Sequence, residues 1–104
     1  MICFVILYIY METYAWDEEK NGLLKITRGV NFDDVKIAIL NGKILDDFPN
    51  PHQDRYPGQR MTIVEIDDYA YLVPYIENED IIFLKTIIPN SKATKKYLRK
   101  ENNI

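Results

Sequence analysis

Three basic side chains are placed where they could stabilise charge on a phosphate group. Arg60 opens an apolar segment after an irregular loop, Lys85 interrupts the apolar segment 81–88, and Lys92 lies in the basic segment that follows. Cations on a sheet and an adjoining helix can bind a phosphodiester and offset the extra negative charge of its pentacoordinate transition state. A simpler interpretation of Lys85 stays open, because a strand with one solvated face also carries an outward-facing lysine.

A second group of residues with possible chemistry surrounds the one histidine. Asp46, Asp47, His52 and Asp54 crowd the junction between a predicted strand and a loop, and carboxylate and imidazole groups bind divalent metals. The spacing matches no calcium-loop pattern, so a solvated acidic loop is the preferred interpretation and we predict no metal or cofactor. His52 is either a plain loop residue or a candidate for proton transfer.

The charge of the chain is divided between its body and its end. Residues 1–84 hold 7 Lys and Arg against 15 Asp and Glu, whereas residues 85–104 hold 6 against 1. The basic residues of the last helix stand at i, i+3, i+4 and i+7 and therefore share one stripe; they are Lys92, Lys95, Lys96 and Arg99. The stripe would attract a nucleic-acid backbone, although a solvated helix face has the same pattern.

Length and composition predict one α+β domain. With 104 residues, of which 47% are hydrophobic, the chain can build a single core. The single Cys3 cannot form an internal disulfide or a structural zinc site, which suits a reducing cytoplasm. The sequence has no P-loop, dinucleotide glycine signature, zinc ligand pair or nucleophile elbow, so those classes are excluded.

The first ten residues form an apolar leader. The run from Ile2 to Tyr10 is uncharged, but a membrane-spanning helix needs roughly 20 apolar residues. It also lacks the basic start and small-residue cleavage site of a signal peptide. The leader is either an extra β-rich segment or translated sequence upstream of a true start at Met11. We prefer the second interpretation, with the domain over residues 11–104 and no membrane partner.

Two helices are expected near the start of the domain. Asp17 can cap a first helix that ends at Gly29, and Asn31 with Asp34 marks the start of a second that runs from 32 to 41. The second helix should face the core with the apolar residues that recur at helical spacing: Phe32, Val35, Ala38 and Ile39.

Strands follow these helices, with a further short strand expected before them. The predicted strands are 14–16, a segment beginning at 44, 61–66, 69–76 and 81–88, with a loop over 49–59. Asp67-Asp68 should form a two-residue hairpin turn, and Pro74 should mark an edge or a bulge. A last helix over 91–100 should carry the basic stripe on one side and pack Ala93, Tyr97 and Leu98 on the sheet.

The order of several short motifs resembles the BrnT family of bacterial toxins. The matching segments are Trp16-Asp17-Glu18-Glu19-Lys20, Leu24, Arg28-Gly29-Val30-Asn31-Phe32, Arg60, Ile87-Ile88 and Lys92-Ala93-Thr94, so that the resemblance covers about residues 14–97. It implies a RelE-like α+β fold with two N-terminal helices, a four-stranded antiparallel sheet and a C-terminal helix. It also implies a metal-independent cytoplasmic ribonuclease, neutralised by a ribbon-helix-helix antitoxin encoded beside it, whose joint complex represses its own promoter DNA.

The resemblance assigns roles by position. Arg60, Lys85 and Lys92 would bind phosphate and stabilise the transition state. The other basic candidates are not assigned by position; we expect Arg28, and Lys95, Lys96 and Arg99 of the basic stripe, to attract RNA by their charge. The family often has Lys-His-Gly-Val where this chain has Thr27-Arg28-Gly29-Val30, and two consecutive basic residues where it has Ser91-Lys92. With that histidine absent, the candidates for proton transfer are His52, Glu65 or a lysine of lowered pKa.

Two other functions stay open at this point. The departures from the family pattern also suit a catalytically inactive interaction module that binds an antitoxin or nucleic acid. A nucleic-acid-binding domain without a toxin role is the third hypothesis. Arg28-Gly29-Val30 and Asn41-Gly42-Lys43 also resemble an uncharacterised domain family with an Arg-Gly-Ile/Val, helix, Asn-Gly-Lys/Glu pattern, which suggests a divergent branch.

Overall fold

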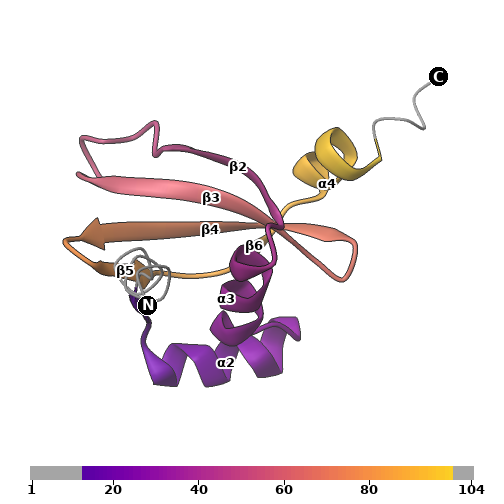
Figure 1. Cartoon of the computed structure of the whole chain (residues 1–104), viewed down its shortest axis with the longest axis horizontal. Coiled ribbons are helices and arrows are strands. Elements are labelled where there is room, and N and C mark those ends of the chain that lie inside the picture. Colours follow the sequence, from indigo (N-terminus) through magenta and orange to yellow (C-terminus); the bar gives the residue numbers. More distant parts are fainter. Residues whose placement is uncertain (1–12, 100–104) are drawn as a thin grey trace, which may run out of the picture.

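The computed structural model describes residues 13–99, so the apolar leader lies outside the described residues. These residues form a sheet with helices on both faces (Figure 1). The strands are β1 (Thr13–Ala15), β2 (Ile44–Pro49), β3 (Gln59–Ile66), β4 (Tyr69–Asn78), β5 (Ile81–Leu84) and β6 (Ile88–Pro89). The helices are α2 (Glu18–Arg28), α3 (Phe32–Leu40) and α4 (Ser91–Leu98). The predicted α+β class is confirmed.

The sheet differs from the expected four-stranded antiparallel one. It has six strands, with the order β1-β5-β4-β3-β2 and with β6 paired to β4 beyond the end of β5. Neighbouring strands are antiparallel except for β1, which runs parallel to β5 with Thr13 opposite Ile81. The expectation was wrong on this point because the sequence of a three-residue strand carries no signal for which distant strand it joins.

The two helices after β1 begin and end where their capping residues predicted. The Asp17 side chain accepts hydrogen bonds from the backbone N–H groups of Glu19 and Lys20, at 2.9 and 3.1 Å. Gly29 closes α2 in the left-handed conformation with φ of 72°, which a residue without a Cβ adopts at little cost. Asn31 and Asp34 form a reciprocal capping box at the start of α3. Both predicted helices are confirmed.

The alternation of side chains along the strands divides the core between the two faces. On the face covered by α2 and α3, hereafter the helix-pair face, the fully buried residues are Phe32, Val35, Val64, Val73, Leu84 and Ile87. On the face covered by α4, hereafter the α4 face, Ile63 and Ala70 pack with Ala93. Tyr97 and Leu98 join this smaller cluster, as predicted. Consecutive residues such as Ile63 and Val64 therefore serve different cores.

The hairpin between β3 and β4 has the predicted two-residue turn. Asp67 and Asp68 adopt φ angles of 52° and 63°, as a type I′ turn requires, and Ile66 pairs with Tyr69. Aspartate is among the residues that tolerate positive φ, because its short side chain can bond to nearby backbone. The turn therefore fixes the register of the longest strand pair in the sheet.

The predicted strand 81–88 is interrupted. β5 ends at Leu84 and β6 begins at Ile88, so Lys85 lies between two strands and not inside one. Tyr75 pairs with Leu84 and Leu72 with Ile88, which leaves two residues of β4 opposite three of the neighbouring chain. Pro74 lies at this irregularity, where the N–H that proline lacks is not needed for a regular ladder. Pro74 therefore faces an interruption of the neighbouring strand, although it pairs regularly with Met61 on its other side, and the expected continuous strand 81–88 is wrong.

Candidate functional site

Two adjacent aspartates of β2 point to opposite faces of the sheet, and each binds a tyrosine. Asp46 lies on the α4 face and accepts a hydrogen bond from the Tyr97 hydroxyl at 2.5 Å. Asp47 lies on the helix-pair face and accepts one from the Tyr75 hydroxyl at 2.7 Å. Strand geometry explains the separation, since successive side chains alternate between faces.

The first pair lies in a cleft of about 220 Å³ between α4 and the strands β2 and β3, hereafter the α4 cleft. The cleft is lined by Asp46, Phe48, Ile63, Asn90, Lys92, Ala93, Lys96 and Tyr97. Lys92 and Lys96 are one helical turn apart on the basic stripe, and both are exposed. The cleft thus combines two ammonium groups, one carboxylate and one phenol, a set that can hold an anion and move a proton.

The hydrogen bond between Asp46 and Tyr97 shifts the pKa of both side chains. The bond from Tyr97 is the main cause that lowers the pKa of Asp46, with help from the Asp47 backbone N–H and the nearby Lys96 charge. The same bond is the main cause that raises the pKa of Tyr97. Lys96 also lies over the Tyr97 ring, with Nζ 5.2 Å from the ring centroid. At neutral pH the carboxylate is therefore ionised and the phenol keeps its proton.

The second pair is closed by an arginine. Arg60 donates to Asp47 Oδ1 from Nε at 2.9 Å and from Nη2 at 2.7 Å, and its Nε also reaches the Tyr75 hydroxyl at 3.3 Å. Burial is the largest cause that raises the pKa of Tyr75 to about 12, and the bond to Asp47 adds to it. The bond to Asp47 is also the main cause that raises the pKa of Arg60. Arg60 is therefore neutralised by a carboxylate and engaged at three contacts.

The structure does not bring the three expected phosphate-binding cations together. Arg60 lies on the helix-pair face beside Tyr75, whereas Lys92 lines the α4 cleft. Lys85 also lies on the α4 face, where it borders a shallow hollow with Ile76 and places its Nζ 5.2 Å from the Phe83 ring centroid. The three side chains therefore do not line one site, because the sheet separates the arginine from both lysines.

The candidates for proton transfer lie apart from these lysines. His52 lies in the exposed loop between β2 and β3, where its backbone N–H donates to Asn50 and its carbonyl accepts from Arg55 and Tyr56. Glu65 lines a separate hollow beside α3, together with Lys43. Neither residue lines the α4 cleft.

The acidic residues around His52 do not form a metal site. Within residues 13–99, no group of three His, Cys, Asp or Glu side chains is arranged to hold a metal ion. Asp46 and Asp47, which are adjacent in the sequence, are separated by the sheet and already bind different tyrosines.

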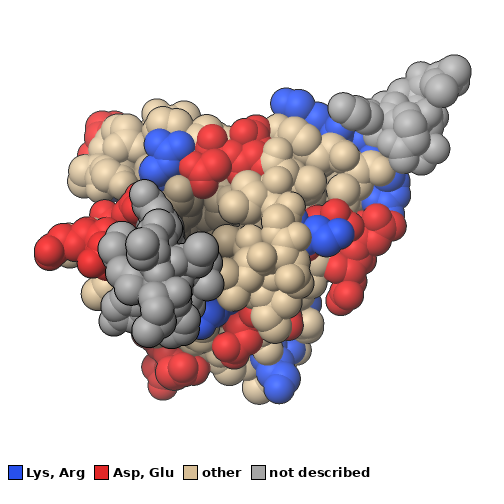
Figure 2. All heavy atoms as spheres, viewed as in Figure 1, with Lys and Arg blue, Asp and Glu red and all other residues tan. Residues whose placement is uncertain are grey.

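The expected RNA-binding residues lie in two places, with Arg28 on α2 and the other three on or directly after α4. Arg28, near the end of α2, donates a hydrogen bond to the Ile87 carbonyl and so links that helix to the segment before β6. Arg99 pairs with the exposed Asp68 at 3.3 Å. The only other ion pair within residues 13–99 joins Arg60 to Asp47, so Lys92, Lys95 and Lys96 stay without one. Basic side chains accordingly gather over α4 (Figure 2).

Sequence reasoning missed two residues of this site. The sequence indicates Asp46 only as a metal ligand, and Tyr97 only as a residue that packs on the sheet. The signal for Asp46 was strand alternation, which places one carboxylate of an Asp-Asp pair on each face. Tyr97 carried a weaker signal, since it follows Lys96 directly on the same helix.

No family model matches the chain, and comparisons with curated proteins and with solved structures also give no match. None of the helices over residues 13–99 is long and apolar enough to cross a membrane.

Proposed function

We propose that this protein is the toxin of a type II toxin–antitoxin pair and acts in the cytoplasm on RNA as a metal-independent endoribonuclease. A ribbon-helix-helix antitoxin encoded beside it would neutralise it and bring it to promoter DNA. The order of the BrnT-like motifs supports this proposal. The observation that carries it is the α4 cleft, where uncompensated lysines and an ionised carboxylate line one hollow.

The cleft contains the groups that 2′-hydroxyl attack requires. Lys92 and Lys96 bind the scissile phosphate and offset its growing charge. The RNA 2′-oxygen forms a bond to phosphorus while its proton passes to Asp46, and the bond from phosphorus to the 5′-oxygen breaks. A lysine ammonium supplies the proton that the leaving 5′-oxygen needs. The products are a 2′,3′-cyclic phosphate and a free 5′-hydroxyl, and the protein forms no covalent bond.

The proposal is tested with Lys92→Ala/Lys96→Ala. Without antitoxin, the wild type should cleave RNA and arrest growth when induced, and the variant should do neither. Its affinity for single-stranded RNA should also depend less on salt, with the slope reduced by about 1.4 because each lost phosphate contact accounts for about 0.7. The matched control is Lys20→Ala/Lys25→Ala on α2, which removes the same charge from the opposite side of the sheet. Equal effects of the two variants, or a wild type that leaves RNA intact, contradict the proposal.

A second candidate is an interaction module of the same fold without catalysis. The placement of Arg60, the expected catalytic cation, favours this function. Arg60 lies on the helix-pair face, away from the α4 cleft, and is bound to Asp47 and Tyr75. Asp46→Asn distinguishes the two functions: an enzyme should keep RNA binding and lose cleavage, since the amide cannot accept the proton. The interaction module is favoured if the affinity of the wild type for RNA falls steeply with salt, while the protein cleaves no RNA and does not change growth.

A further inference from the structure

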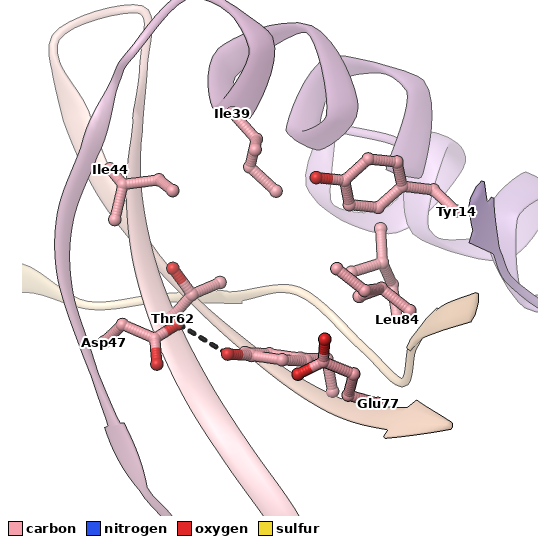
Figure 3. Close-up of a pocket in the computed structure, with 9 residues that line it drawn as sticks. Tyr14, Ile39, Ile44, Asp47, Thr62, Glu77 and Leu84 are labelled. Carbon is pink, nitrogen blue, oxygen red and sulfur yellow. Dashed lines mark hydrogen bonds between the residues drawn. The ribbon is translucent and has the colours of Figure 1, made fainter. Parts of the chain in front are cut away.

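The helix-pair face contains a cavity of about 210 Å³ that the proposed RNA chemistry does not use. It lies between the end of α3, the start of β2 and the sheet (Figure 3). Ile39 and Ile44 point into it from one side, and Tyr14 and Leu84 lie across from them (Figure 3). Ile82 adds a further apolar wall. The volume equals roughly seven times the ~30 Å³ that one water occupies in the liquid, so the cavity can hold a short aliphatic chain.

Two carboxylates lie among the polar residues that line the other part of this cavity, and only one of them is compensated. Both oxygens of Asp47 accept hydrogen bonds, from Arg60 and from Tyr75. Glu77 lies opposite Ile82 in the ladder, on the same face of the sheet, and is exposed. Within residues 13–99 Glu77 forms no ion pair. The cavity therefore presents a free negative charge beside an apolar wall.

We propose that this cavity binds an alkylammonium group, meaning an aliphatic chain of about four carbons that ends in a cationic nitrogen. The chain contacts Ile39, Ile82 and Leu84, and the ammonium pairs with Glu77. A lysine side chain has the same two parts, an apolar stem that packs and a charged end that stays hydrated. A free alkylamine and a lysine of a bound protein share this chemistry. The site is independent of the proposed RNA cleavage, because the sheet separates it from the α4 cleft.

Methyl NMR on the full chain tests the proposal with two probes. The first is n-butylamine, which is protonated at neutral pH, and the second is a short peptide with one central lysine. Each should shift the δ-methyl signals of Ile39, Ile44 and Ile82 and leave that of Ile63, on the α4 face, in place. Uncharged 1-butanol and the same peptide with norleucine in place of lysine are the controls. Binding of the peptide alone supports a protein source of the ammonium, and binding of butylamine supports a small-molecule source.

A charge-removing variant tests the role of Glu77. Glu77→Gln should weaken binding about fivefold, as expected for loss of one partly exposed ion pair. Because Glu77 is exposed, the variant should fold like the wild type, which circular dichroism checks. Glu79→Gln is the matched control, since Glu79 lies in the next turn and does not line the cavity. The proposal is overturned if neither probe shifts these signals, if butanol binds as tightly as butylamine, or if Glu77→Gln binds like the wild type.

Discussion

Asp46 and Asp47 are chemically identical neighbours whose surroundings give them different uses. Asp46 and Tyr97 lie at an open cleft beside lysines that form no ion pair with any residue from 13 to 99. Asp47 binds Arg60 and the hydroxyl of Tyr75, whose side chain is only 9% exposed. The first carboxylate can therefore exchange its partner for a substrate. The second is held by groups whose loss would disturb the core.

The largest expected effect comes from removing the buried tyrosine. Tyr75→Ala should lower the free energy of unfolding by about 3–5 kcal/mol, the usual loss when a large buried aromatic becomes alanine. The cause is the lost packing in the core of the helix-pair face, together with the loss of the hydrogen bond to Asp47 Oδ2. Urea denaturation measures the change.

Tyr97→Ala is the matched control, because Tyr97 also donates to an aspartate of β2 but is half-buried, whereas Tyr75 is buried. Its destabilisation should be clearly smaller. If both variants lose the same free energy of unfolding, the Asp47–Tyr75 and Asp46–Tyr97 pairs do not differ in their contribution to the fold.

The second effect is a loss of stability at high pH. Because the folded pKa of Tyr75, about 12, is above its ordinary value of 10.0, the protonated tyrosine stabilises the fold fully below pH 10. This stabilisation, on the order of 2 kcal/mol, should disappear as the pH rises from about 10 to 12. Tyr75→Phe should lack that part of the decline in a series of urea denaturations.

The exposed Tyr56 provides the comparison, since Tyr56→Phe removes a hydroxyl outside both pairs. The interpretation fails if Tyr56→Phe reduces the alkaline decline as much as Tyr75→Phe does.

The smallest expected effect concerns the open pair at low pH. The pKa of Asp46 is lowered below its ordinary value of 3.8, so its ionised form stabilises the fold above that value. The contribution should be lost as the pH falls through the lower, folded pKa. In Asp46→Asn, the free energy of unfolding should therefore fall less at low pH than in the wild type. The difference should be small, because the Asp46–Tyr97 bond lies near solvent. Asp54→Asn, in the exposed loop outside both pairs, is the matched control.

Local features of the fold could be predicted because each depends on a few neighbouring residues. The capping residues Asp17 and Asn31, the left-handed Gly29 and the turn at Asp67-Asp68 all lie where the sequence placed them. Capping bonds and turn angles are formed within about four residues, so the sequence contains both partners.

The candidate site was predicted only in part. Lys92 and Lys96 were identified from helical spacing, and both line the α4 cleft. Arg60 and Lys85 were grouped with them, although the sheet separates Arg60 from the others. The grouping failed because the face that Arg60 takes depends on the register of β3 with strands far away in the sequence, and because the interruption of the predicted strand at Lys85 depends on the pairing with β4.

The sequence by itself determined where the helices begin, the hairpin turn and the basic stripe of α4, because these follow from short-range hydrogen bonding and helical periodicity. Tertiary structure alone decided that β1 joins β5 in parallel, that the chain leaves the sheet at Lys85, and that Asp46 and Asp47 meet different tyrosines. These outcomes depend on the packing of segments far apart in the chain. That packing decided which of the two neighbouring carboxylates lies beside uncompensated lysines.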